Sequence, residues 1–167
     1  FLDSTKLKEN TLLIALNDNG SQYGIYVYND GMRGRKAVVY HGGPRAYSFW
    51  RYGERYTVGD RFGLSAHLDI LPTLADICNL NIPDGLNEKL DGMSLKPVLE
   101  DSSVTVDPDR MIVHHRGRWS VAENWSEHKY CSALVRWRNY TLVRVEHCND
   151  LENCVACYKV ATRCDTN

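Results

Sequence analysis

The most constraining feature of the sequence is a short apolar run that ends in turn-forming residues. The run covers residues 11–16, and Asn17-Asp18-Asn19-Gly20 follows it directly. A continuous apolar run closed by turn residues is typical of a strand buried on both faces, usually in a parallel sheet. Open α/β sheets bind their ligands beyond the carboxyl ends of such strands. The sequence therefore predicts a central parallel strand with Asp18 and Asn19 well placed for chemistry.

The residues that follow predict a long loop, a second strand and a helix. Residues 20–46 are rich in Gly, Tyr and Arg and show little periodicity, which indicates an ordered loop of the kind that often carries function. Residues 45–52 predict a strand. Within residues 65–78, Asp69 is placed to cap a helix and Pro72 falls in the first turn of that helix. The apolar face predicted for this helix consists of Leu71, Leu74, Ala75 and Cys78.

The last third of the sequence predicts a small antiparallel unit. After a short helix near residues 95–99 and a connector over residues 101–109, residues 111–113 predict a strand. Residues 132–145 predict a hairpin that turns at Arg138-Asn139. The aromatic residues expected in the core of this unit are Trp119, Trp125, Trp137 and Tyr140.

These elements together predict an α/β fold of two parts. Residues 1–105 are expected to be the remnant of a sheet-and-helix domain. Residues 106–167 are expected to form a small antiparallel α+β subdomain with a cysteine-rich tail.

Charge and hydropathy argue against two classes of partner. The 167 residues carry a formal net charge of −1, with acidic and basic residues interspersed, so the overall balance indicates neither a nucleic-acid nor an anionic-membrane partner. The longest apolar runs fall far short of the roughly 20 residues that a membrane helix needs. The start Phe1-Leu2-Asp3 is not a signal peptide, and we expect the sequence to begin inside a longer protein.

Four of the six cysteines crowd the end of the sequence: Cys148, Cys154, Cys157 and Cys164. Their spacing admits a zinc site or two disulfides, but zinc knuckles usually pair two Cys-x-x-Cys hooks and only one is present. Disulfides require an oxidising compartment. The sequence favours this second alternative and with it a periplasmic or secreted location.

Two segments carry candidate chemistry. Asp18-Asn19 offers a carboxylate and an amide oxygen, hard ligands suited to calcium or magnesium, although calcium takes about 6–8 oxygens and Asp-Asn-Gly also forms ordinary turns. Residues 32–36, Met-Arg-Gly-Arg-Lys, form a basic cluster that can bind an anion through a lysine point charge and arginine forks. A solvated loop and a nucleic-acid patch are the competing interpretations. The nucleic-acid patch is opposed by the lack of aromatic residues interleaved with the basic ones.

Five segments, taken in order, closely resemble the C-terminal half of the sulfatase family. They are the apolar strand with Asp18-Asn19-Gly20, then residues 31–36, 42–45, 68–74 and 90–95. The resemblance covers residues 5–100, and residues 115–119 are similar to a segment of some bacterial arylsulfatases. It implies an alkaline-phosphatase-like fold and hydrolysis of sulfate esters, on small molecules or on sulfated carbohydrates.

The resemblance also assigns roles to individual residues. Asp18 and Asn19 would coordinate the active-site Ca²⁺, or Mg²⁺ in its place, and Lys36 would bind the sulfate and help the bridging oxygen leave. A dication and an ammonium both stabilise charge on sulfuryl oxygens, so the assignment agrees with physical expectation. His115, at the end of a predicted strand, is a further candidate for substrate contact.

The sequence departs from the family pattern in places that matter. His41 stands where the family usually has Glu, and Ala46-Tyr47 replaces a Val-Pro pair; both changes bear on the conformation of the loop. The family's nucleophile is a formylglycine made in the pattern Cys/Ser-x-Pro-x-Arg. None of the five prolines has Cys or Ser two positions before it, so this chain alone is expected to be inactive.

Two alternatives stay open. One is a phosphodiesterase or phosphonate hydrolase of the same superfamily, which would use a Thr or Ser nucleophile with additional zinc ligands. The other is a sulfatase-like binding module without activity.

Overall fold

The computed structural model describes residues 1–116, Asn124, Ser126, residues 132–144 and the backbone of residues 158–161. The contacts divide the chain into two compact units. The first unit comprises Phe1–Leu16 and Tyr47–Arg110, and the second comprises Asn17–Ala46 and Met111–Asn167. The predicted division at residue 105 stays a prediction, and the loop after the first strand belongs to the second unit.

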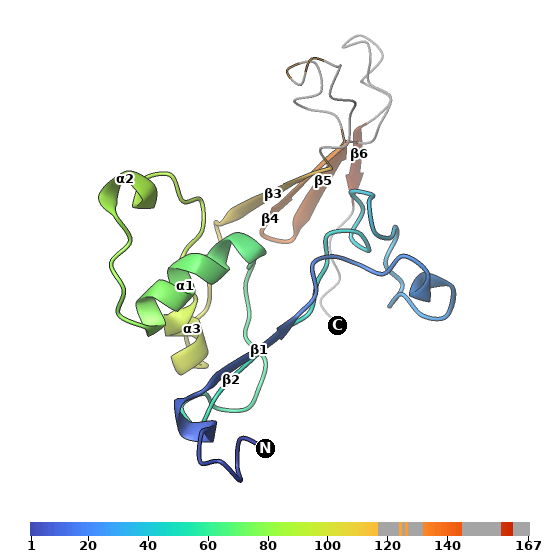
Figure 1. Cartoon of the computed structure of the whole chain (residues 1–167). Coiled ribbons are helices and arrows are strands. Elements are labelled where there is room, and N and C mark those ends of the chain that lie inside the picture. Colours follow the sequence, from blue (N-terminus) through green and yellow to red (C-terminus); the bar gives the residue numbers. More distant parts are fainter. Residues whose placement is uncertain (117–123, 125, 127–131, 145–157, 162–167) are drawn as a thin grey trace. The chain divides into compact units, whose positions relative to one another are not determined.

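The first unit contains a two-stranded antiparallel sheet (Figure 1). Strand β1 (Leu12–Leu16) pairs with β2 (Ser48–Tyr52), and Ile14 faces Trp50 in the register. The prediction of a parallel, fully buried strand is wrong in the described chain. The apolar run specifies a strand but not its partner, and here the loop that follows returns the chain alongside β1. Alternate residues of β1 are exposed, with Leu13 at 51%.

The helices of the first unit are short. They are the 3₁₀ helices Lys8–Asn10 and His67–Asp69, and the α-helices α1 (Ile70–Ile77), α2 (Asp84–Asn87) and α3 (Lys96–Glu100). The face predicted for α1 is wrong in part, because Leu71 is 50% exposed and the buried residues are Thr73 and Ala75. The Thr73 hydroxyl donates to the Asp69 carbonyl at 2.6 Å and accepts the Leu95 N–H at 2.8 Å. Hydrogen bonding rather than apolar spacing therefore decides which side of α1 is buried.

Asp69 is fully buried at the start of α1. Its carboxylate accepts the N–H groups of Ala66 at 2.8 Å and Met93 at 3.0 Å, and it meets both terminal nitrogens of Arg110 at 2.5 and 2.8 Å. The expected capping is confirmed at the 3₁₀ helix that leads into α1, where the carboxylate accepts the N–H of the N-cap residue Ala66, but this side chain does not bind the N–H groups of α1 itself. The carboxylate instead ties three separate segments of the first unit together.

The second unit contains a four-stranded antiparallel sheet (Figure 1). Its strands, in spatial order, are β3 (Met111–His115), β4 (Ala133–Trp137), β5 (Tyr140–Arg144) and β6 (Tyr158–Ala161). The predicted hairpin is confirmed: β4 and β5 turn at Arg138, which has a φ of 49°.

One face of this sheet buries the core of the second unit. Leu134 is 0% exposed, Val143 4% and Val39 7%, and Tyr40 packs against them. The aromatic core predicted for this part is wrong at Trp137 and Tyr140, which stack on each other at 6.1 Å but are 37% and 59% exposed. Trp119 and Trp125 lie outside the described residues.

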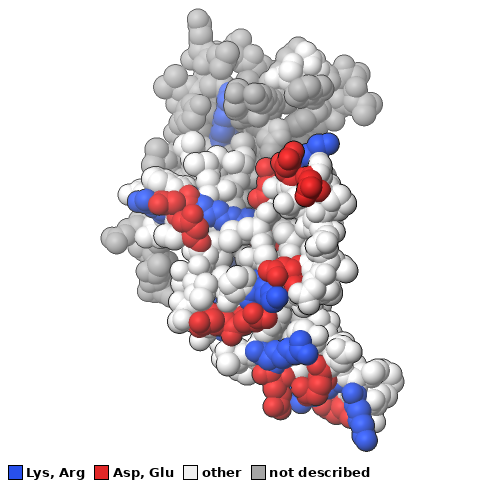
Figure 2. Space-filling view, turned by 90° about the vertical axis from the view of Figure 1, so that its left-hand side faces the viewer, with Lys and Arg blue, Asp and Glu red and all other residues white. Residues whose placement is uncertain are grey.

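The face of the molecule in Figure 2 carries both charge signs. Figure 2 shows one face, on which acidic and basic side chains lie among one another. Among the described helices, none combines the length and the apolar character that a membrane crossing requires.

Candidate active site

The turn after β1 and the basic loop, which the sequence keeps apart, meet in the second unit. The Gly20 N–H donates to the Gly43 carbonyl at 2.7 Å, and the Lys36 N–H donates to the Ser21 carbonyl at 3.1 Å. Inside the loop, the Gly42 N–H donates to the Arg33 carbonyl at 2.9 Å. Backbone hydrogen bonds thus join three of the five segments on which the family resemblance rests.

Close backbone packing explains the glycines at this meeting point. A β-carbon on Gly20 would lie 1.8 Å from the carbonyl oxygen of Gly42, and one on Gly43 would lie 1.8 Å from that of Val38. Real β-carbons do not approach backbone atoms so closely. Only glycine allows the two loop segments to pack this closely. Close backbone packing therefore requires glycine at positions 20 and 43.

Lys36 stands at the tip of a tight turn. The Val38 N–H closes the turn on the Arg35 carbonyl at 3.2 Å, with Lys36 and Ala37 at its centre. Ala37 has a φ of +67°, a left-handed conformation that costs energy for a residue with a β-carbon. The Lys36 side chain is 44% exposed, and its Nζ lies 3.9 Å from Oδ2 of Asp18. The ammonium is therefore positioned beside the carboxylate that follows β1.

Asp18 and Asn19 fit a hard cation in their donor chemistry, but they do not complete a site. The Asp18 side chain is 78% exposed, so its oxygens remain accessible, and the backbone carbonyl of Asn19 accepts from the Asn17 amide at 2.5 Å. Within the described residues, no group of three or more His, Cys, Asp or Glu side chains is gathered as a metal would require. Two adjacent oxygen ligands suit calcium, which needs several more.

Lys36 also lines a cavity of about 460 Å³ in the second unit. The lining residues are Gln22, Arg35, Lys36, Ala37, Val38 and Arg116. Sequence reasoning missed Gln22 and Arg116 as site residues. The available signal for Arg116 was its place in the segment 115–119, which resembles arylsulfatases.

His115 is not among the residues that line this cavity. It is exposed at the end of β3, where it pairs with Ala133. The predicted contact of His115 with substrate stays a prediction.

His41, the departure from the family pattern, lies on the inner side of the loop. Its Nε2 forms a hydrogen bond with Oγ1 of Thr141 on β5 at 2.8 Å. Burial lowers the pKa of His41 below its usual value, and the nearby cations of Arg136 and Arg45 lower it further. The imidazole therefore links the basic loop to the sheet in its neutral form.

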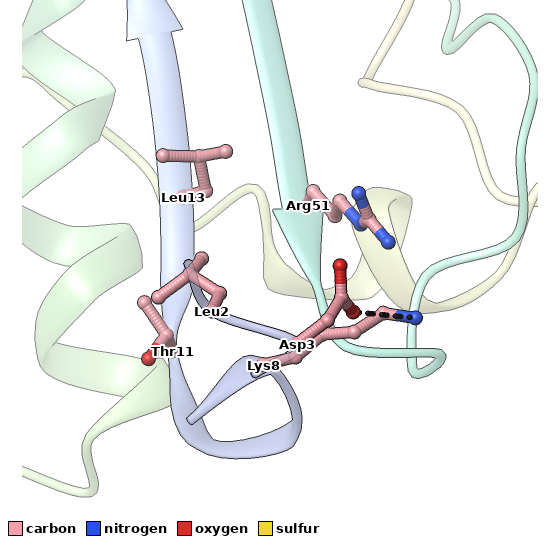
Figure 3. Close-up of a pocket in the computed structure, with 6 residues that line it drawn as sticks. All are labelled: Leu2, Asp3, Lys8, Thr11, Leu13 and Arg51. Atoms are coloured by element: carbon pink, nitrogen blue, oxygen red, sulfur yellow. Dashed lines mark ion pairs between the residues drawn. The ribbon is translucent and has the colours of Figure 1, made fainter. Parts of the chain in front are cut away.

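A smaller hollow in the first unit offers a contrast (Figure 3). It has a volume of about 100 Å³ and is lined by Leu2, Asp3, Lys8, Thr11, Leu13 and Arg51. Lys8 forms an ion pair with Asp3 at 3.6 Å, and the Arg51 side chain lies on the same side of the hollow. Asp3 is thus itself a lining residue of this hollow, whereas Asp18, the partner of Lys36, is not among the residues that line the larger cavity.

The cysteine-rich tail lies outside the described residues. This applies to Cys148, Cys154, Cys157 and Cys164, and to the part of the arylsulfatase-like segment after Arg116. The choice between zinc and disulfides stays a prediction.

Two proteins named as sulfatases are similar to this chain in sequence. A sulfatase of Formosa agariphila is 32% identical over 118 residues, which are 69% of this chain and 21% of that protein. The uncharacterized sulfatase YdeN of Escherichia coli K12 is 33% identical over 94 residues, which are 56% of this chain and 16% of that protein. No family model matches the sequence. The chain thus spans about a fifth or less of the length of these relatives.

Solved structures of Ps i-CgsB share the fold. One contains the protein alone and another contains it in complex with k-i-k-neocarrahexaose. Each matches with a TM-score of 0.69 and 23% identity, over 87% of this chain and 30% of that chain. At this identity the likeness shows the fold alone.

Proposed function

We infer that this chain, which resembles the sulfatase family in sequence and shares the fold of Ps i-CgsB, supplies one side of the active site of a sulfate-ester hydrolase with alkaline-phosphatase-like architecture. The observation that carries the proposal is the ion pair of Lys36 with Asp18, at 3.9 Å. The two residues come from separate segments, and the resemblance assigns both of them to one site.

Lys36 is proposed to act on the reacting sulfate. When the S–O bond breaks, negative charge grows on the bridging oxygen and spreads over the sulfuryl oxygens. An ammonium held at a rigid turn stabilises that charge without having to reorganise. The strained backbone at Ala37 supports this role, because such strain tends to occur where function requires a fixed geometry.

Asp18 and Asn19 are proposed to hold Ca²⁺, with Mg²⁺ as the other candidate. Their hard oxygens fit either ion, and the remaining ligands would come from other segments of the parent protein or from the substrate. A bound dication would lower the energy of negative charge on the sulfate oxygens. The formylglycine nucleophile is likewise proposed to lie elsewhere in the parent protein, so that this chain by itself has no activity.

The proposed substrate class is a sulfated carbohydrate. The bound oligosaccharide in the structure of Ps i-CgsB supports this choice over a small sulfate ester, although it is a property of that protein. A periplasmic or secreted location belongs to the same proposal, since polymeric carbohydrates are met outside the cytoplasm.

The test is a sulfate-release assay on the protein that carries this chain. Lys36→Ala is expected to lower kcat by roughly 10²-fold or more, the usual cost of removing one donor to a developing oxyanion. Lys89→Ala, at an exposed lysine of the first unit, is the matched control and should keep the parent rate. Thermal unfolding of each variant checks that the fold is intact.

The same sulfate-release assay tests whether activity requires a divalent metal ion. Removal of divalent cations with a chelator should abolish sulfate release, and added Ca²⁺ should restore it. Near-normal sulfate release by a folded Lys36→Ala variant would rule out the assignment. Hydrolysis of phosphodiesters in place of sulfate esters would favour the other branch of the superfamily.

A further inference from the structure

We propose that the cavity beside Lys36 binds a second anionic group of the substrate through Arg35 and Arg116, so that the preferred substrate is a carbohydrate with two anionic groups. The proposal rests on the proposed function for the reacting sulfate. The second group, a sulfate or a carboxylate, is not cleaved and serves to orient the sugar.

The first argument for an anion site is the charge of the residues that line the cavity. Among the described residues that line the cavity, Arg35, Lys36 and Arg116 are cationic and none is acidic. Asp18, outside this lining, lies 3.9 Å from Lys36. Even with Asp18 beside Lys36, cations outnumber the acidic groups at the described part of the cavity, and like charges around one cavity repel each other and focus a positive field into it. An anion that enters the cavity relieves this repulsion. A sulfate held at Lys36 is one anion, and Arg35 and Arg116 line the same cavity, where each can contact another anionic group.

The second argument is the size of the cavity, which fits a sugar ring. A volume of about 460 Å³ lies within the range of about 300–1,000 Å³ that is typical of small-molecule sites. It exceeds what a lone sulfate fills and is adequate for a sugar ring. Ala37 and Val38 offer an apolar surface to the ring, and the Gln22 amide can both donate to and accept from its hydroxyls.

The backbone also supports the proposal, because hydrogen bonds hold the main chain of the cationic residues in two independent segments. Arg35 and Lys36 lie on the tight turn closed by Val38, and Arg116 directly follows β3. The Arg116 N–H donates to the carbonyl of Ser132, a buried residue just before β4, at 2.9 Å. A main chain that is already ordered need not be ordered when a ligand binds, which favours affinity.

The arginines suit the binding of the second anionic group, and Lys36 suits the reacting sulfate. Guanidinium groups present planar forks that match the paired oxygens of a sulfate or carboxylate, and they stay charged at any working pH. The Lys36 ammonium is a compact charge suited to the reacting oxygen. The surface in Figure 2 mixes both signs, and the net charge is −1. The net charge alone therefore does not favour polyanions, and the proposal assigns the selectivity to this local cluster.

The experiment compares two substrates in the protein that carries this chain. One is a monosulfated saccharide and the other has the same sugar skeleton with two sulfates; a third, with one sulfate and one carboxylate, distinguishes the second anion. The quantity measured is the ratio of kcat/KM for the disulfated to that for the monosulfated saccharide. Arg35→Gln and Arg116→Gln should each lower this ratio by about 10-fold to 100-fold, the usual worth of a hydrogen bond to a charged group.

Arg55→Gln is the matched control, at an exposed arginine that packs on Tyr52 in the first unit, and it should leave the ratio unchanged. A ratio that stays at the parent value in both cavity variants, with folding verified by thermal unfolding, would overturn the proposal. If the carboxylated saccharide shows the same preference as the disulfated one, the cavity recognises anions in general, as proposed.

Binding constants measured by calorimetry test this inference independently of hydrolysis, and so independently of the proposed function. If no saccharide is hydrolysed, the function fails, and the binding constants of the same saccharides decide the inference. Tighter binding of the disulfated saccharide that both arginine variants lose would support the second anion site. Equal affinity of the parent protein for the monosulfated and disulfated saccharides would overturn it.

Discussion

His41 shows how one residue can join a site to its scaffold. It bonds to Thr141 on β5, and burial together with the cations of Arg136 and Arg45 holds its pKa below the usual 6.5. In the unfolded chain the imidazole has its ordinary pKa, so it binds a proton there that the folded protein excludes. Stability from this source is present above pH 6.5 and falls as the pH drops from 6.5 toward the folded pKa.

Replacing this residue should therefore change the pH dependence of stability. We expect the free energy of unfolding of the parent chain to fall as the pH drops below 6.5, and to fall by less in His41→Gln. The measurement is chemical denaturation at several pH values. His67→Gln, at an exposed histidine of the first unit, is the control and should follow the parent. Parallel curves for His41→Gln and the parent chain would show that His41 is not the titrating group.

Candidate site residues could be predicted where the neighbouring residues in the sequence mark them. Asp18-Asn19 and Lys36 stand out because turn residues and glycines flank them in a recognisable order. The structure places Asp18 and Lys36 in an ion pair, while the metal and sulfate roles stay proposals. Arg116 could not be found in this way, because its position at the cavity depends on the pairing of β3 with β4, which are distant in the sequence.

The buried ion pair of Asp69 and Arg110 connects separate segments of the first unit. Asp69 is fully buried and the Arg110 side chain is 11% exposed, so the charges are shielded from water. The Arg110 guanidinium also donates to the Leu64 carbonyl at 2.9 Å. The pair connects the turn before α1, the segment at Met93 and the end of the first unit.

Removing one partner should therefore be costly. Arg110→Met leaves the Asp69 carboxylate buried without its cation, and we expect a loss of about 3–5 kcal/mol in the free energy of unfolding. Lys8→Met breaks the exposed Asp3–Lys8 pair and should cost no more than about 1 kcal/mol. Denaturant unfolding monitored by circular dichroism compares the two. Similar costs for both variants would contradict the role given to burial.

Elements were predictable in kind but less so in their pairing. Turn chemistry predicted the β4–β5 hairpin correctly, since residues at a tight turn have few alternatives. The apolar run at β1 correctly predicted a strand, but the expected parallel partner is replaced by antiparallel β2. The buried side of α1 escaped prediction because Thr73 is held there by hydrogen bonds, which apolar periodicity does not register.

The whole second unit depends on two distant parts of the sequence. Val39, from the basic loop, packs with Leu134 and Val143, from the hairpin. The Lys36 turn therefore has no core of its own, and the sheet supplies it.

A cavity in this core should loosen the Lys36 turn. Leu134→Ala, at a fully buried position, should cost about 2–5 kcal/mol. It should also speed hydrogen exchange at the amides of Lys36 and Gly43, which are hydrogen-bonded within the loop. Leu142→Ala, 42% exposed on the same sheet, should change neither quantity appreciably. Unchanged exchange at Lys36 in the Leu134 variant would show that the turn holds its shape independently.

The shared core of the second unit also sets an order of events during synthesis. A ribosome makes Val39 about 100 residues before Val143, and at about 5–20 residues per second the delay is roughly 5–20 s. During that interval the nascent loop carries its glycines and cations without the sheet that later packs against it. The Lys36 turn can settle only after the hairpin has emerged, so this half of the site matures late on the ribosome.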